Sequence, residues 1–117
     1  MRKRLSAKKY YERLPIQNKL KLQEIELIAK ELMIEHGVLD YQFEFGRSRK
    51  YAGICYYGSK FIRLDIDYCI RNDFDKIKNT ILHEIAHALV GEVHGHRKVW
   101  QDKAKELGVT WTRNYRP

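Results

Sequence analysis

Four of the five histidines of this chain fall within residues 83–96, in the segment HEIAHALVGEVHGH. His83 and His87 are four residues apart, so on an α-helix they point about 40° apart around the axis, one turn above the other. Glu84 lies about 100° from His83 and can face the same site. Any fold of this chain should therefore present residues 83–87 as one helical turn whose polar side chains converge.

The H-E-x-x-H spacing is typical of metallopeptidases, in which two imidazoles bind a metal ion beside a carboxylate general base. Neutral imidazole suits zinc, and catalytic zinc takes three protein ligands and leaves a fourth position for water. The ion lowers the pKa of that water, and Glu84 would accept its proton and pass it to the leaving amine. The pattern predicts one Zn²⁺ per chain, with His83 and His87 as ligands and Glu84 as catalytic acid and base.

The third metal ligand is left open by the spacing alone. His94 and His96 follow His87 by seven and nine residues, whereas the metzincin pattern needs a histidine six residues after the second one. Glu106, nineteen residues after His87, roughly suits a thermolysin-like glutamate ligand. Its place near a predicted helix end is more typical of a solvated surface charge.

The length of 117 residues predicts one domain, and no apolar run of about 18 residues indicates a membrane span. The basic N-terminus lacks the apolar segment of a secretory signal. Cys55 and Cys69 form no C-x-x-C pair, which indicates free thiols in a reducing compartment. We therefore expect a cytoplasmic protein.

A net charge of +8 favours a polyanion as partner. Basic residues stand beside aromatic ones in a mobile N-terminal arm, in residues 47–51 and in residues 111–117, a pattern that suits single-stranded nucleic acid. Tyr51 and Trp111 are expected to be core residues, because large aromatic side chains are usually buried. The arm is therefore the favoured contact for DNA.

Apolar spacing predicts three longer helices. The first opens at Pro15 and stops at Gly37, and the second carries HEIAH and ends near Gly91. Asn72 or Asp73 would cap the second helix, and a last helix, roughly 97–107, would follow the histidine-rich loop.

Alternating apolar residues predict strands at 41–45 and in a hairpin at 53–66, with a two-residue turn at Gly58-Ser59. The order of helix, strands, helix and helix indicates an α+β fold.

Four segments carry a family resemblance: RSRKYAGICYY, KFIRLDI, ILHEIAHALVG and GHRKVW. With them the chain resembles the SprT-like zinc peptidases, which include the Spartan DNA–protein crosslink proteases, over most of residues 17–112. The resemblance implies that His96 is the third zinc ligand and that Trp100 packs beneath the site. His94 then faces the substrate, lies on the surface, or replaces His96.

The same resemblance implies a single zincin-like domain at 15–117, with a small antiparallel or mixed sheet, behind a basic arm at 1–14. We expect a monomeric endopeptidase that acts on proteins at or crosslinked to DNA, near the nucleoid if the host is bacterial. A substrate strand would run along the GSKFIRL segment. The alternatives are a non-catalytic nucleic-acid-binding module braced by zinc, and a metal-dependent nuclease.

Overall fold

The computed structural model describes residues 4–92 and 97–110, which form an α+β domain as the sequence predicts. None of the helices in these ranges has the length and apolar composition needed to cross a membrane. The elements, in chain order, are α1 (Ala7–Glu12), α2 (Ile16–Glu35), β1 (Gln42–Gly46), β2 (Gly53–Tyr56), β3 (Phe61–Asp65), α3 (Ile66–Arg71), α4 (Phe74–Val90) and α5 (Lys98–Leu107).

The three strands form one mixed sheet in the order β1-β3-β2, where β1 runs parallel and β2 antiparallel to β3. The strand of the GSKFIRL segment, β3, is therefore central, and both of its edges are already paired. The prediction that a substrate would run along it is wrong, because a strand can be added only at a free edge. Among the described residues, β1 and β2 are the edge strands.

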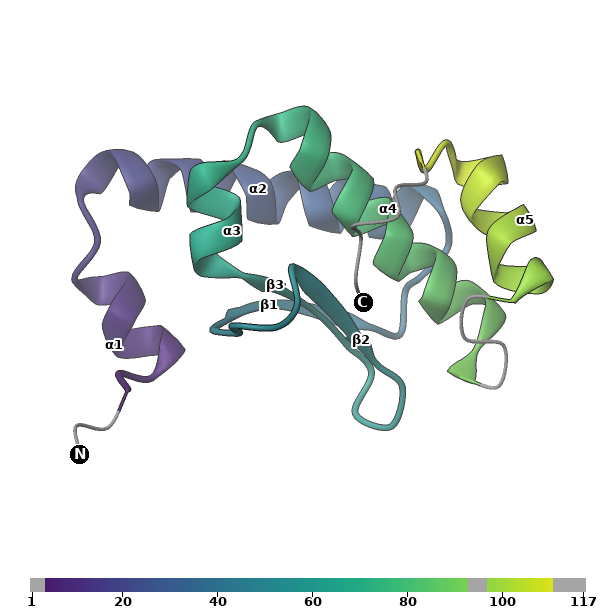
Figure 1. Ribbon diagram of the computed structural model, residues 1–117, viewed down its shortest axis with the longest axis horizontal. Helices are drawn as coiled ribbons and strands as arrows, with labels where there is room; N and C mark the ends of the chain where they lie inside the picture. Colours follow the sequence, from purple (N-terminus) through teal and green to yellow (C-terminus); the bar gives the residue numbers. More distant parts are fainter. Residues whose placement is uncertain (1–3, 93–96, 111–117) are drawn as a thin grey trace.

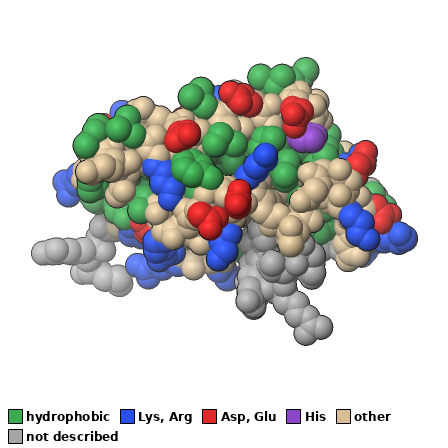
Figure 2. All heavy atoms as spheres, turned by 90° about the horizontal axis from the view of Figure 1, so that it is seen from above, with side chains coloured by type: hydrophobic (Ala, Val, Ile, Leu, Met, Phe, Trp, Pro, Cys, Tyr) green, Lys and Arg blue, Asp and Glu red, His purple; other side chains and the backbone are tan. Residues whose placement is uncertain are grey.

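Helices α2 and α4 lie side by side over one face of the sheet (Figure 1). Strand residues at alternate positions point toward these helices and form the core with them. The helical layer, which Figure 2 views from outside, carries apolar patches between charged side chains. The buried apolar residues of the sheet and of α2 are Phe43, Ile62, Leu64, Leu22, Ile25, Ala29 and Met33.

The predicted ends of α2 are confirmed. Pro15 occupies the N-cap position, where its missing N–H is not needed, and Gly37 follows the helix with a φ of 79°. The side of α2 away from the core also exposes the apolar residues Leu20, Leu27 and Ile34, among charged ones.

The described part of the predicted arm is a helix held to the domain, so the prediction that it is mobile is wrong for these residues. Ser6 caps α1 by accepting a hydrogen bond from the Lys9 N–H at 3.2 Å. The Tyr10 hydroxyl donates to Asp67 in α3 at 2.5 Å, a link between residues far apart in the sequence. The division of the chain into 1–14 and 15–117 stays a prediction.

Two local predictions are corrected. Residues 66–71 form α3, because the Asp65 carboxylate accepts a hydrogen bond from the Tyr68 N–H at 3.0 Å and so starts a helix directly after β3. The hairpin turn spans residues 57–60, since Tyr56 pairs with Phe61. Its left-handed residue is Lys60, with a φ of 59°, so the predicted two-residue turn at 58–59 does not form.

Gly53 is the point where the sheet and α4 come closest. A Cβ there would lie 3.0 Å from both Leu64 Cδ2 and Thr80 Cγ2, and 3.3 Å from Glu84 Cγ. A larger residue at position 53 would therefore push β2 away from α4.

We predict that Gly53→Val lowers the free energy of unfolding by about 1–3 kcal/mol, the usual cost of overpacking. Gly58→Val is the matched control, because a Cβ at Gly58 meets nothing within 4 Å. Urea unfolding of both variants measures the difference, and equal stabilities would contradict the close approach at Gly53.

Candidate active site

The helix α4 places the polar turn, and its sequence explains both of its ends. The Asp73 carboxylate accepts a hydrogen bond from the Lys76 N–H at 2.9 Å, and Gly91 ends the helix with a φ of 90°. Both ends were predicted from the sequence. The apolar residues Ile77, Ile81 and Ile85 are buried and fix the rotation of the helix, which turns its polar residues inward.

Residues 83–87 form the predicted turn, and its three polar side chains are all buried. His83 and Glu84 are 0% exposed and His87 is 4% exposed. The two imidazole rings lie 5.0 Å apart between centroids, on the same side of α4. The structure therefore brings together three of the four predicted site residues.

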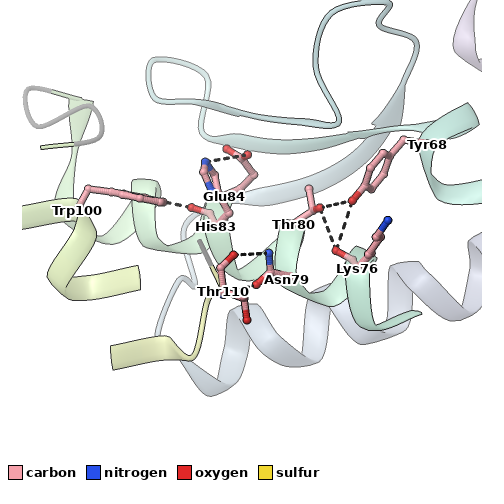
Figure 3. A network of polar contacts seen from close by, with 8 residues as sticks. All are labelled: Tyr68, Lys76, Asn79, Thr80, His83, Glu84, Trp100 and Thr110. Atoms are coloured by element: carbon pink, nitrogen blue, oxygen red, sulfur yellow. Dashed lines mark hydrogen bonds and ion pairs between the residues drawn. The ribbon is translucent and has the colours of Figure 1, made fainter. Parts of the chain in front are cut away.

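Helix α5 forms the floor beneath the two histidines through Trp100, which is 1% exposed. Its ring lies 4.6 Å from the His83 ring, and it stacks on the His87 ring at 5.0 Å with an interplanar angle of 24°. The indole N–H donates to the His83 carbonyl oxygen at 3.4 Å (Figure 3). Trp100 thus packs beneath the site, as the resemblance implied.

Small side chains and one polar pair fix α5 against α4. Ala86 and Ala104 are buried with Trp100, and their size lets the two helices approach closely. After α5 ends, the Thr110 N–H donates to the Asn79 side chain at 2.6 Å, and the Asn79 amide donates back to the Thr110 carbonyl at 3.2 Å. Figure 3 shows this pair, with Asn79 on α4 and Thr110 on the segment after α5, in the same view as His83.

Strand β2 covers the opposite side of the polar turn, a role that sequence reasoning missed. Gly53 and Cys55 occupy alternate positions that face α4. Burial raises the pKa of the Cys55 thiol to about 12, and the Glu84 charge adds to the effect. The pKa of Tyr57, two residues further, is also raised, first by burial and then by the charges on Cys55 and Glu84. Continuing the strand alternation past Tyr56 could have placed both residues at the site.

Glu84 is the electrostatic centre of this arrangement. Burial raises its pKa from 4.5 to about 8. Within the described ranges neither of its carboxylate oxygens accepts a hydrogen bond, and the His83 Nε2 atom lies 4.0 Å from one of them. A buried carboxylate without hydrogen bonds is costly to charge, and a nearby cation would offset this cost. His83 and His87 therefore provide two imidazoles that could bind a metal ion, with the Glu84 carboxylate beside them.

The other candidate ligands do not complete the site within the described residues. His94 and His96 lie outside these residues. Glu106 is described, and it forms an ion pair with Lys103 at 2.8 Å with 65% of its side chain exposed. Since the described residues contain no group of three His, Cys, Asp or Glu side chains that could hold a metal, Glu106 does not join His83 and His87. It is a surface charge.

Both cysteines, Cys55 and Cys69, are free thiols, as predicted. Cys69 is fully buried beside α2 in the core, and burial raises its pKa to about 12. Both thiols are therefore protonated and behave as small apolar side chains.

Comparison with known proteins identifies the family of this chain and a similar fold. Residues 17–115 match the SprT-like family. A search of curated proteins found no significant match. The fold is similar to the crystal structure of the metallopeptidase zymogen jannalysin of Methanocaldococcus jannaschii, with a TM-score of 0.62 and 18% sequence identity over 77% of this chain and 84% of that chain.

We predict that Glu84→Gln stabilises the metal-free protein, because it removes a buried charge. The pKa of Glu84 in the folded chain, about 8, exceeds its ordinary value of 4.5, so the penalty of ionisation is absent below about pH 4.5 and complete above about pH 8. The gain in unfolding free energy should thus be small at pH 5 and about 1 kcal/mol or more at pH 9.

Thermal unfolding with a chelator present, at both pH values, measures this gain. Glu106→Gln is the control, since that carboxylate is exposed. A stability gain that is independent of pH, or equal in the two variants, would contradict the burial of an unpaired Glu84 charge.

Proposed function

Since this chain belongs to the SprT-like family and is a metallopeptidase, we propose that it is a zinc-dependent endopeptidase that cleaves proteins at or crosslinked to DNA. The observation that carries the proposal is the buried Glu84 carboxylate beside His83, one turn from His87. In this proposal His83, His87 and His96 are the ligands of one Zn²⁺ per chain, and Glu84 is the catalytic residue.

The protein contributes to the reaction by holding and moving protons. When bound, zinc supplies Lewis-acid chemistry that lowers the pKa of a water and polarises a peptide carbonyl. Glu84 accepts a proton from the attacking water and donates it to the departing amine nitrogen. Its burial favours the neutral acid after the first transfer, which keeps the proton at hand for the second. Trp100, packed against His83 and His87, limits how far their rings can turn.

The free edge of β2 is the proposed place for the substrate chain. An extended peptide beside Gly53–Tyr56 would hydrogen-bond to the strand backbone and become a further strand of the sheet. Strand β2 contacts α4, and a Cβ at Gly53 would lie within 3.3 Å of Glu84 Cγ, so a peptide there would lie near the general base. Because backbone groups provide most contacts, we expect little preference for particular residues.

The proposed link to DNA rests on the net charge of +8 and on the family resemblance. A basic protein would be concentrated on DNA and on the proteins attached to it. We propose a monomer that works in the cytoplasm, at the nucleoid if the host is bacterial. Proteins held on DNA would then be the substrates encountered most often.

We predict that His87→Ala removes the metal, because it leaves His83 without its partner one helical turn away. Purified wild-type protein should carry about one zinc per chain. The variant should carry less than about a tenth of that. Elemental mass spectrometry of the purified proteins measures the ratio, with His36→Ala, at the end of α2, as the control histidine variant. Full zinc content in His87→Ala would contradict the ligand assignment.

We predict that Glu84→Gln keeps the zinc but lowers cleavage at least about 100-fold, because the general base is lost. The substrate is a protein crosslinked to a DNA oligonucleotide, and the products are resolved on a gel with and without free single-stranded DNA. If zinc-loaded wild-type protein never cleaves it, or if Glu84→Gln cleaves equally well, the chain is instead a zinc-braced nucleic-acid-binding module.

A further inference from the structure

Two basic segments that are distant in the sequence form one surface in the structure. The guanidinium group of Arg47, in the loop after β1, lies 3.9 Å from the centroid of the Tyr10 ring of α1. The same group donates a hydrogen bond to the Leu5 carbonyl oxygen at 3.0 Å. Tyr10 in turn binds Asp67 of α3. Residues 4–9 and 47–50 are thereby held next to each other.

The surface that results carries unpaired positive charge. In the described part of the chain, no ion pair or side-chain hydrogen bond involves the side chains of Arg4, Lys8, Lys9 or Arg49. All of these residues and Lys50 are exposed. We call the set of five the α1–loop surface: Arg4, Lys8, Lys9, Arg49 and Lys50.

The two nearby carboxylates of β3 and α3 are bonded to groups of the domain and form no ion pair with these cations among the described residues. Asp65 accepts hydrogen bonds from the backbone N–H groups of Ser48, at 2.7 Å, and Tyr68, at 3.0 Å. Asp67 accepts from the Tyr10 hydroxyl at 2.5 Å. The one acidic residue within residues 4–14 is Glu12, at the last position of α1.

The aromatic residues of α1 are engaged with the domain and are poorly placed to stack on bases. One face of the Tyr10 ring is covered by Arg47, and its hydroxyl is bonded to Asp67. Tyr11 packs against the core, and its hydroxyl accepts a hydrogen bond from Gln23 at 3.4 Å. Helix α1 thus offers cations without free rings, which suits phosphate groups better than unpaired bases.

We infer that the α1–loop surface binds the phosphate backbone of DNA. This inference rests on the proposed function, because it supplies the DNA contact which that function requires. Phosphate contacts carry no sequence information, so binding depends on salt and not on base sequence. The N-terminal segment was expected to stack on bases. We infer instead that it makes charge contacts from α1, which Arg47 and Asp67 hold in place.

The α1 part of the α1–loop surface lies away from the polar turn of α4, whereas Arg49 and Lys50 precede β2. In Figure 1, α1 stands at one end of the molecule, whereas α5 and the last turns of α4 stand at the other. DNA centred on α1 would leave the β2 edge open, so one molecule could hold DNA and a peptide chain at the same time.

The test measures DNA binding directly, without any cleavage. Fluorescence anisotropy follows a labelled 20-base-pair duplex, and a single strand of the same length, as they bind the Glu84→Gln protein, purified with its metal, at several salt concentrations. The test variant adds Lys8→Ala, Arg49→Ala and Lys50→Ala. The control variant adds Lys30→Ala, Lys78→Ala and Lys105→Ala, which remove equal charge from α2, α4 and α5.

The slope of log K against log salt is negative, and each lost phosphate contact on duplex DNA makes it less steep by about 0.9. The slope of the test variant should therefore be less steep by about 3, and this variant should bind at least about 30-fold more weakly at low salt. The slope of the control should change by less than about 1. Circular dichroism confirms that both are folded. Equal weakening in the two variants, no binding by the parent protein, or single-strand binding that varies strongly with base sequence would overturn the inference.

A cleavage assay distinguishes a failure of this inference from a failure of the proposed function. With Glu84 restored, the test variant should cleave a free unfolded protein as fast as wild type, but cleave a DNA-crosslinked protein at least about 10-fold more slowly. Loss of both activities would point to a damaged active site and contradict the separation of the two surfaces. A protein that binds DNA as inferred but cleaves neither substrate would contradict the proposed peptidase activity alone.

Discussion

The structure depends on burying one polar helical turn inside an apolar interior. His83, Glu84 and His87 are almost completely buried, and the Glu84 carboxylate accepts no hydrogen bond from the described residues. Such a turn lowers stability unless its charge is compensated, so the rest of the fold must hold it in place. A metal ion is the simplest compensation, because it binds the imidazoles and attracts the carboxylate.

Helix α5 and strand β2 hold this turn from opposite sides. The contact residue of α5 has a very large side chain, and that of β2 has none. Trp100 of α5 fills the space beneath both histidines with a single large ring. Gly53 of β2 has no side chain, which lets the edge strand approach α4 near Glu84. The close packing beneath the site gives it rigidity, and the edge strand is where we propose that the substrate backbone pairs. The buried Glu84 destabilises the fold and the surrounding core stabilises it, a trade-off that is common at catalytic sites.

Local signals in the sequence predicted α4 well, because Asp73 and Gly91 act within a few residues of the helix ends. The sheet order was not predictable in the same way: β3 is central because it pairs in parallel with β1 as well as with β2, and this long-range pairing leaves no local pattern. Helix α3 was not predicted, because Asp65 is both the last residue of a strand and the N-cap of the helix that follows it. The role of Arg47 also depends on a distant contact, with α1. His96 lies outside the described residues, so its assignment as third ligand stays a prediction.

The central claim is that three imidazoles hold one zinc ion while Glu84 remains unbound beside it. A crystal structure of the zinc-loaded protein, with anomalous diffraction recorded at the zinc edge, tests this claim most directly. The account predicts one anomalous peak bound by His83, His87 and His96, with a water at the fourth position and Glu84 within hydrogen-bond reach of that water. A peak elsewhere, a fourth protein ligand, or Glu84 bound directly to the metal would contradict it.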